Sequence, residues 1–384
     1  MRFEFATSNR IVFGTGTVKE VSKIASSYGT RVFLVSGIRN ENFFELSENL
    51  RTAGIKPKIF YVDQEPTVEM VQEGVRLAID HGCQFIISFG GGSAIDFGKA
   101  IAALIKNSGE VIDYLEVIGK GAALTNPSAP HIAIPTTAGT GAEVTRNAVL
   151  RSQEYKVKVS LRSPYMLPTV AVVDPELTYS LPQSTTASTG LDALTQLIEP
   201  YVSSAANPLT DAICVEGMRH AARSLRRAYE DGSDVAARHD MSVASLFGGM
   251  ALANARLGAV HGFAGPLGGE IAAPHGAICA RLLPVVMDVN IRALTQREPD
   301  HDALRRYRDI AQIVTGGRNA SPQDGVDWVE ELCDMLNISG LSIFGLKKEN
   351  FPKMVEDAAK SSSMKGNPIP LSIHEMYEIL QRTL

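Results

Sequence analysis

The amino-acid sequence predicts an α/β protein with an N-terminal domain built on a parallel sheet and a C-terminal all-α helical domain. Strand-like and helix-like segments alternate up to about residue 181, and such alternation is typical of a parallel sheet covered on both faces. Beyond that point strand patterns nearly vanish and long apolar-periodic helices follow. We therefore expect two domains, spanning residues 1–181 and 182–384.

The first domain contains strand-like segments separated by helical ones. The expected strands cover residues 11–13, 31–35, 57–62, 85–89, 131–134 and 169–173. Helical periodicity covers residues 18–27, 68–81 and 93–105. The segment 85–89 is apolar except for Ser88, as expected of a central strand in a parallel sheet.

Two glycine-rich turns follow expected strands. The segment 85–89 runs into Gly90-Gly-Gly-Ser93, where glycines let the backbone approach an anion and the amides at the start of the next helix face it. The segment 131–134 runs into Pro135-Thr-Thr-Ala-Gly-Thr-Gly141, which is rich in hydroxyls. One such turn is equally well explained as a plain tight turn. Two of them at the carboxyl ends of strands indicate a dinucleotide site.

The second domain is predicted to consist of helices. Apolar periodicity covers residues 191–201, 208–229, 236–260, 280–291, 302–314, 325–336, 348–361 and 373–384.

A possible metal site stands out in this helical domain. His261 and His275 bound a stretch of mostly small, uncharged residues that follows an apolar run, and we expect this stretch to form a turn rich in glycine and proline. A lone histidine there would be read as a satisfied core residue. Asp192 and Gln196 lie four apart and share a helix face, and an acid among apolar residues is costly to bury without a partner. A divalent cation would compensate it, and Asp192, His261 and His275 suit zinc or Fe(II).

Composition gives no indication of a nucleic-acid or membrane partner. The formal net charge is -5, and the 37 basic residues form no long cluster. No segment reaches the ~20 apolar residues of a membrane span, and the start lacks an apolar signal core. The four cysteines have no C-x-x-C spacing and indicate neither a zinc knuckle nor a disulfide framework. We therefore expect a cytoplasmic protein.

Taken in order, the motifs resemble those of the iron-containing (type III) alcohol dehydrogenases over essentially the whole chain. The resemblance rests on Gly90-Gly-Gly-Ser93, Pro135-Thr-Thr-Ala-Gly-Thr-Gly-Ala-Glu-Val-Thr145, Asp192-Ala-Leu, Asn207-Pro-Leu-Thr-Asp211, His261 and Pro274-His-Gly276. It implies a Rossmann-like domain that binds a nicotinamide cofactor and a helical domain that binds one divalent metal, Fe2+ or Zn2+. We expect hydride transfer in a cleft between the domains, and a homodimer.

The resemblance also assigns residues to both sites. It implies cofactor contacts for Gly91, Gly92, Ser93, Asp96, Thr136, Thr137, Thr140, Thr145 and Lys158. It implies that Asp192, His261 and His275 act in catalysis through the metal that they bind. The family's fourth ligand is a histidine four residues after the aspartate, where this chain has Gln196. A neutral amide oxygen is a poorer ligand than imidazole, and the remaining set resembles that of zinc-dependent glycerol dehydrogenases, which slightly favours zinc.

Two further departures affect the expected chemistry. Family members commonly carry a second histidine four residues after His261, thought to help relay a proton, and this chain has Gly265. Proton exchange is then expected to use water, cofactor hydroxyls or another group. NAD-specific relatives tend to carry an aspartate where this chain has Gly37, with Arg39 close by. Without that acid a 2′-phosphate is not repelled, so we expect NAD(P)(H), with NADP(H) favoured.

The sequence thus predicts an NAD(P)-dependent, metal-assisted oxidoreductase that interconverts a small alcohol and its aldehyde or ketone. A lyase of the dehydroquinate-synthase type is one alternative, because it shares the two-domain plan, NAD and the metal. That activity requires a basic pocket for a phosphorylated sugar acid, and the segments around Asp192 and His261 contain few cations. The other alternative is a nucleotide-binding protein that has lost metal and activity, as Gln196 and Gly265 would allow.

Overall fold

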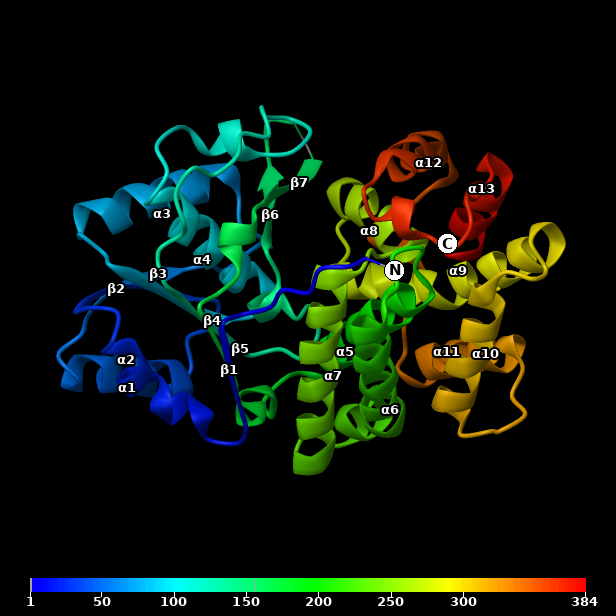
Figure 1. Ribbon diagram of the computed structural model, residues 1–384, viewed down its shortest axis with the longest axis horizontal. Coiled ribbons are helices and arrows are strands. Elements are labelled where there is room, and N and C mark those ends of the chain that lie inside the picture. Colours follow the sequence, from blue (N-terminus) through cyan, green and yellow to red (C-terminus); the bar gives the residue numbers. More distant parts are fainter. Residues whose placement is uncertain (1, 156) are drawn as a thin grey trace. The chain divides into compact units, whose positions relative to one another are not determined.

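The computed structural model describes residues 2–155 and 157–384, and these residues form two compact units. The α/β unit comprises residues 7–137 and 141–179. The helical unit comprises residues 2–6, 138–140 and 180–384. The parallel sheet of the first unit and the helices of the second confirm the predicted fold class (Figure 1).

The α/β unit is built on a six-stranded sheet with the order β1-β8-β5-β4-β2-β3, in which every pairing is parallel. The strands are β1 (Arg10–Phe13), β2 (Arg31–Ser36), β3 (Lys56–Tyr61), β4 (Phe85–Gly90), β5 (His131–Pro135) and β8 (Val170–Val173). All six were predicted, with ends shifted by a residue or so. The central strands β4, β5 and β8 were readable because every residue in them is buried, which makes them largely apolar along their length.

Helices cover both faces of this sheet. They are α1 (Val21–Ala25), α2 (Glu41–Thr52), α3 (Val68–Asp80) and α4 (Gly92–Leu104), with α1 and α2 on one face and α3 and α4 on the other (Figure 1). The side chains of successive residues in β2 lie on opposite faces of the sheet. Val32 and Leu34 pack with α1 and α2, whereas Phe33 and Val35 pack with α3 and α4.

The sequence reading missed some elements of this unit. It did not predict α2, nor the antiparallel pair β6 (Asn147–Ser152) and β7 (Val157–Arg162). Short 3-10 helices also occur: Thr17–Glu20, Val111–Tyr114, Ala142–Val144, Pro164–Met166 and Pro175–Thr178. β6 was missed because it has only six residues and its exposed apolar Val149 breaks the apolar–polar alternation that marks a half-buried strand.

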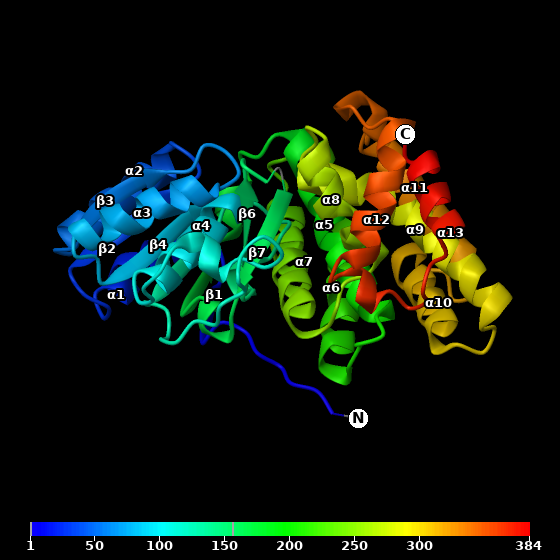
Figure 2. The ribbon, with the colours of Figure 1, turned by 90° about the horizontal axis from the view of Figure 1, so that it is seen from above.

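The helical unit contains α5 (Gln183–Val202), α6 (Pro208–Glu230), α7 (Val235–Asn254), α8 (Ala259–Glu270), α9 (His275–Arg297), α10 (Asp302–Thr315), α11 (Pro322–Met335), α12 (Phe351–Lys360) and α13 (Ile373–Arg382). Short 3-10 helices cover Leu341–Phe344, Lys348–Asn350 and Met364–Gly366. Helices α5, α6 and α7 lie side by side in both ribbon views (Figures 1 and 2). Nearly all of α5 from Gly190 onward is buried, so it forms the centre of the unit.

One predicted helix was wrong in its extent. The segment 236–260 is not continuous, because α7 ends at Asn254 and α8 begins at Ala259 after a bend of 96°. The glycine-rich stretch after it was expected to be a turn, yet it is helical despite Pro266. Burial of Val260, Phe263 and Leu267 on one face of α8 outweighs the low helix propensity of its glycines and proline, because tertiary packing supplies most helix stability.

The predicted domain boundaries also need a correction. Residues 2–6 and 138–140 were placed in the N-terminal domain, but they group with the helical unit. Both backbone groups of Ala6 are hydrogen bonded by the side chain of Asn254, at 2.6 and 2.8 Å. The carbonyl oxygen of Gly139 accepts a hydrogen bond from Gln196 Nε2 at 3.3 Å. These contacts attach both short segments to helices of the second unit.

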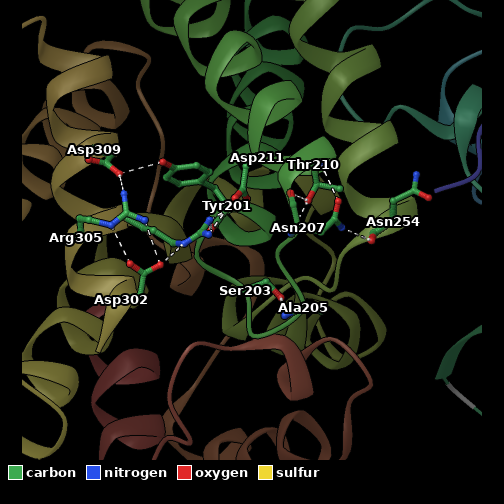
Figure 3. Close-up of polar contacts among 11 residues, drawn as sticks. Tyr201, Ser203, Ala205, Asn207, Thr210, Asp211, Asn254, Asp302, Arg305 and Asp309 are labelled. Carbon is green, nitrogen blue, oxygen red and sulfur yellow. Dashed lines mark hydrogen bonds and ion pairs between the residues drawn. The ribbon is translucent and has the colours of Figure 1, made fainter. Parts of the chain in front are cut away.

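The motif Asn207-Pro-Leu-Thr-Asp211 has a structural role at the start of α6 (Figure 3). Asn207 and Thr210 form a reciprocal capping box, with hydrogen bonds of 3.2 Å in both directions, and this satisfies amides that a helix start leaves unpaired. Asn207 also donates to the carbonyl oxygen of Asn254. Asp211 accepts two hydrogen bonds from Arg306, at 2.8 and 2.9 Å. The motif therefore fixes α6 against its neighbours.

Within the described residues, no individual helix has both the length and the apolarity needed to cross a membrane. In the part of the chain that the structure describes, one bent pair, α7 and α8, meets those criteria when its two helices are taken together.

Candidate active site

Three helices bring the predicted metal ligands together. Asp192 lies within α5, His261 lies in the first turn of α8, and His275 is the first residue of α9. His261 Nε2 is 3.5 Å and His275 Nε2 is 3.9 Å from Asp192 Oδ1. The two imidazole ring centroids are 5.5 Å apart. Residues separated by some seventy positions in the sequence therefore present an oxygen and two nitrogens to one point.

A fourth side chain, Cys279, joins this group and was not predicted. Its ligand atom and those of Asp192, His261 and His275 all lie within 4.8 Å of one another. The signal was present in the sequence, because Cys279 follows His275 by four residues and so shares its face of a helix. The sequence pattern predicted that this helix begins at residue 280, whereas α9 begins at His275.

The environment of Asp192 fits a bound cation. Its side chain is only 2% exposed, and Oδ1 has no hydrogen-bond partner. Burial alone would raise the pKa of Asp192, but the facing imidazoles of His261 and His275 hold it below its ordinary value. A buried carboxylate oxygen without a hydrogen bond is costly. The atoms around it are nitrogen and sulfur donors, which are metal ligands in proteins, so the residues present fit a divalent ion.

Glu199 orients His261. Its Oε2 accepts a hydrogen bond from His261 Nδ1 at 2.6 Å, and its Oε1 accepts one from the amide of Val260 at 2.7 Å. The tautomer follows from these partners: Nδ1 carries the proton, so Nε2 is directed to Asp192. Burial lowers the pKa of His261, but Cys279, Asp192 and Glu199 raise it well above its usual value. A carboxylate behind a ligating histidine is a common device of metal sites, and it too was not predicted.

We expect Glu199→Gln to weaken metal binding by about 10–100-fold, the usual effect of losing such an outer partner. The glutamine side chain is neutral and has only one acceptor oxygen. It therefore cannot accept hydrogen bonds from both His261 Nδ1 and the backbone amide of Val260, as the two oxygens of Glu199 do. Competition with a chromophoric chelator measures the change. Glu216→Gln is a matched control, because Glu216 is an exposed glutamate on α6. Equal metal affinity in Glu199→Gln and the unaltered protein would contradict the role of Glu199.

Gln196 lies one turn after Asp192 on α5 and is buried. Its Nε2 donates to the Gly139 carbonyl oxygen, and its side chain helps to lower the pKa of Asp192. Its Oε1 is buried without a hydrogen-bond partner. Gln196 is therefore placed beside the cluster, with its amide nitrogen already engaged.

Gly265 leaves open space at the position where the sequence resemblance implies a histidine. A Cβ atom built on Gly265 meets no other heavy atom within 4 Å. The position lies one turn after His261 on α8. Nothing in the local packing therefore requires glycine at this position.

In the α/β unit, the predicted phosphate turn lies at the topological switch point of the sheet. β2 continues through α2 to β3 on one side, whereas β4 continues through α4 to β5 on the other. Ligands of open α/β sheets bind outside the carboxyl ends of strands at such a point. The candidates at these ends are Gly37 after β2, Gly91, Gly92 and Ser93 after β4, and Thr136 and Thr137 after β5.

Close contacts show that these strand ends converge. The amide of Gly37 donates to the Phe89 carbonyl oxygen, and the amide of Thr136 donates to that of Gly90, both at 3.0 Å. Gly90 has φ +157°, and a Cβ atom there would lie 2.7 Å from the Cβ of Ala94. Only glycine fits that approach. Helix α4 begins at Gly92, so its free amides face this edge of the sheet.

Lys99 connects two further candidates behind the turn. Its Nζ lies 2.7 Å from Asp96 Oδ1 and 2.9 Å from Thr145 Oγ1, and its side chain is fully buried. Asp96 Oδ2 also accepts the amide of Val149. Lys99 also affects Glu143. Burial raises the pKa of Glu143 to about 7, and the positive charge of Lys99 opposes this rise. Asp96 and Thr145, predicted as cofactor contacts, therefore share one buried cation.

Two predicted cofactor residues have other surroundings. Lys158 on β7 pairs with Glu65 Oε1 at 2.5 Å. Thr140 groups with the helical unit, so its role beside the turn stays a prediction.

The surroundings of Gly37 modify the predicted role of Arg39. The guanidinium forms two hydrogen bonds with the carboxylate of Asp63, at 2.7 and 2.9 Å, and it lies over the ring of Tyr61. Both partners are at least half exposed, and exposed ion pairs are weak. A 2′-phosphate near Gly37 would therefore compete with Asp63 for Arg39.

Comparison with known proteins finds relatives along nearly the whole chain. The profile described as "Iron-containing alcohol dehydrogenase" matches residues 8–175, and "Fe-containing alcohol dehydrogenase family, C-terminal" matches residues 186–384. The 1,3-propanediol dehydrogenase of Klebsiella pneumoniae is 35% identical over 381 residues, or 95% of each chain. The NAD-dependent methanol dehydrogenase of Bacillus methanolicus is 33% identical over 382 residues, or 97% of each chain.

A solved structure gives the same result for the fold. The crystal structure of a 1,3-propanediol oxidoreductase has a TM-score of 0.92 and 34% identity, with 100% of both chains covered. Both profiles and these full-length matches show that the chain belongs to the iron-containing alcohol dehydrogenase family.

Proposed function

We propose that Asp192, His261 and His275 hold the divalent metal with which this enzyme interconverts a small alcohol and its aldehyde or ketone. Family membership makes the chain an oxidoreductase acting on alcohols, and the family binds NAD(H) and a divalent metal. The observation that supports the ligand assignment is the buried Oδ1 of Asp192, which has no hydrogen-bond partner and lies opposite two imidazole nitrogens.

When bound, the metal supplies Lewis acidity toward the substrate oxygen, and the nicotinamide supplies the hydride carrier. The side chains of the site orient the proposed ligands and set their environment. Glu199 keeps the proton of His261 on Nδ1 and leaves Nε2 free to ligate. The side chains of Asp192 and His261 are only 2% and 8% exposed, which strengthens electrostatic interactions between them, whereas that of His275 is 39% exposed. Because Gly265 provides no imidazole, we expect the proton released or taken up to pass through water, a cofactor hydroxyl or another group of the protein.

The cofactor is proposed to bind at the carboxyl edge of β2, β4 and β5. Its diphosphate would face the amides of Gly91, Gly92 and Ser93 at the start of α4, where backbone donors and the helix dipole favour anions. Thr136 and Thr137 would flank it from the neighbouring strand end. We propose that NADP(H) is used at least as well as NAD(H), because Gly37 carries no acid to repel a 2′-phosphate.

We expect Gly37→Asp to shift the preference towards NADH by about tenfold or more, because a carboxylate there repels the 2′-phosphate and binds the ribose hydroxyl. A Cβ atom at Gly37 would lie 3.3 Å from the Cβ of Ala94, which requires only a small adjustment. Asp63→Asn should shift the preference the other way, since it frees Arg39. Steady-state kcat/KM for both cofactors measures each change. A strong NADH preference in the unaltered protein would refute the NADP(H) proposal.

An NADPH-oxidation and NADH-oxidation screen over small aldehydes, with protein loaded separately with zinc and Fe(II), tests the proposed function. Reduction that depends on added metal supports it. Turnover of a phosphorylated sugar acid without net cofactor oxidation would instead favour the lyase alternative. Binding of nucleotide without any metal or turnover would favour the inactive alternative.

Two broader expectations stay predictions. We propose a cytoplasmic location, which the four cysteines support because all are free thiols. We also propose a homodimer, which sedimentation of the purified protein tests.

A further inference from the structure

We propose that the thiolate of Cys279 is a fourth protein ligand of the metal, beside Asp192, His261 and His275. The proposal rests on the metal assignment made under the proposed function. It adds a ligand that the family resemblance does not imply, and it assigns the metal as zinc.

The spacing of the four ligand atoms carries the proposal. Cys279 Sγ lies 3.6 Å from His275 Nε2 and 3.9 Å from His261 Nε2. The same nitrogens lie 3.9 and 3.5 Å from Asp192 Oδ1. Around a tetrahedral zinc with bonds of about 2.0–2.3 Å, neighbouring ligand atoms are about 3.3–3.6 Å apart. The separations of 3.5 and 3.6 Å match the edges of such a tetrahedron, and the two of 3.9 Å are slightly longer.

A second observation points to a ligand independently of the thiol. Asp192 is 2% exposed in its side chain, and the oxygen that faces both imidazoles has no hydrogen-bond partner. Cys279 itself is fully buried. By contrast, Cys333, a buried cysteine on α11, donates to the carbonyl oxygen of Ala280. Cys279 faces two ring nitrogens instead, so its surroundings differ from those of a merely structural thiol.

Cys279 offsets the departure at Gln196. The family's imidazole at position 196 is replaced by an amide whose nitrogen is engaged by the Gly139 carbonyl oxygen. A thiol one turn after His275 restores a set of four protein ligands. Thiolate is a soft ligand that favours zinc, whereas an all-nitrogen and oxygen set serves iron well. Some catalytic zinc sites expand to five-coordinate, so four protein ligands leave a route for a substrate oxygen to reach the ion.

The test uses the full chain, stripped of metal with a chelator and titrated anaerobically with Co2+, which replaces zinc and reports its ligands by absorption. We expect a near-ultraviolet sulfur-to-cobalt charge-transfer band at saturation. Cys279→Ala and Cys279→Ser should lose the band and bind zinc about 10–100-fold more weakly. Cys214→Ala is the matched control, because Cys214 is a fully buried thiol on α6 of the same unit, and it should keep both. Gln196→Ala should keep the band.

The outcomes separate the two proposals. Cobalt bound without a sulfur band, together with unchanged zinc affinity in both Cys279 variants, overturns the thiolate ligand and leaves the metal assignment standing. A band that survives Cys279→Ala but disappears in Cys214→Ala also overturns it. If Cys279→Ser retains part of the zinc affinity that Cys279→Ala loses, ligation at position 279 is supported, because a hydroxyl is a weaker donor at the same place. Failure of the unaltered protein to bind any divalent ion overturns both proposals.

Discussion

The double variant His261→Ala/His275→Ala is expected to lose its metal and nearly all activity. Both imidazoles face Asp192 Oδ1, and without them only two of the four clustered donors remain. Metal Lewis acidity contributes several kcal/mol to catalysis. A loss of about 4 kcal/mol corresponds to a fall in rate on the order of 10³-fold. Elemental analysis and kcat/KM measure the two effects on the same preparation.

The matched control is His239→Ala/His374→Ala, which removes two imidazoles from exposed positions of α7 and α13. It should retain the metal and the activity. Cofactor binding should persist in the His261→Ala/His275→Ala protein, because the residues proposed to bind the nucleotide fold in the α/β unit. Persistence of cofactor binding distinguishes loss of the metal from loss of the fold. A metal content equal to that of the unaltered protein would show that the ion binds elsewhere.

Much of the α/β unit was predictable because its strands and turns are marked by residue types within short stretches of sequence. The central parallel strands β4, β5 and β8 are buried along their length, and the turn after β4 needs glycine at Gly90, where φ is +157°. The antiparallel pair β6 and β7 was missed because its strands are short and partly exposed. The role of Lys99 was also missed. A buried lysine can be recognised only when its partners are known, and Thr145 lies 46 residues away.

The metal site shows a sharper limit. Asp192, His261 and His275 were predicted from a pattern of residue types, but Cys279 and Glu199 required the helix ends. Whether Cys279 faces His275 depends on α9 beginning at residue 275 rather than 280, and the proline and glycine around it concealed that start. Likewise, Glu199 meets His261 only because the chain bends between α7 and α8. Tertiary packing fixed both features, and local propensity opposed them.

Lys99→Met is expected to weaken cofactor binding strongly while the protein stays folded. The variant leaves Asp96, which is only 15% exposed, without its cation, and removing one partner of a buried ion pair costs about 3–5 kcal/mol. Asp96 lies on the first turns of α4, and Thr145 ends the loop after β5. The loss therefore disturbs both elements proposed to contact the cofactor. Isothermal titration with NADP+ and NAD+ should show affinity reduced by about 10–100-fold, a shift of about 1.4–2.8 kcal/mol.

The controls separate positioning from general stability. Lys106→Met removes an exposed lysine just beyond the end of α4 and should leave cofactor affinity unchanged. Lys99→Arg keeps the charge and should recover part of the affinity. Asp96→Asn combined with Lys99→Met should reduce cofactor affinity by less than the sum of the two separate losses, because residues in one network are coupled.

Burial raises the pKa of Glu143 to about 7 and Lys99 opposes that shift, so Lys99→Met should raise this pKa further. The folded variant then keeps Glu143 protonated to higher pH, and NMR titration of labelled glutamate carboxyls measures the change. Cofactor affinity equal to that of the unaltered protein in folded Lys99→Met would show that Lys99 supports the fold alone.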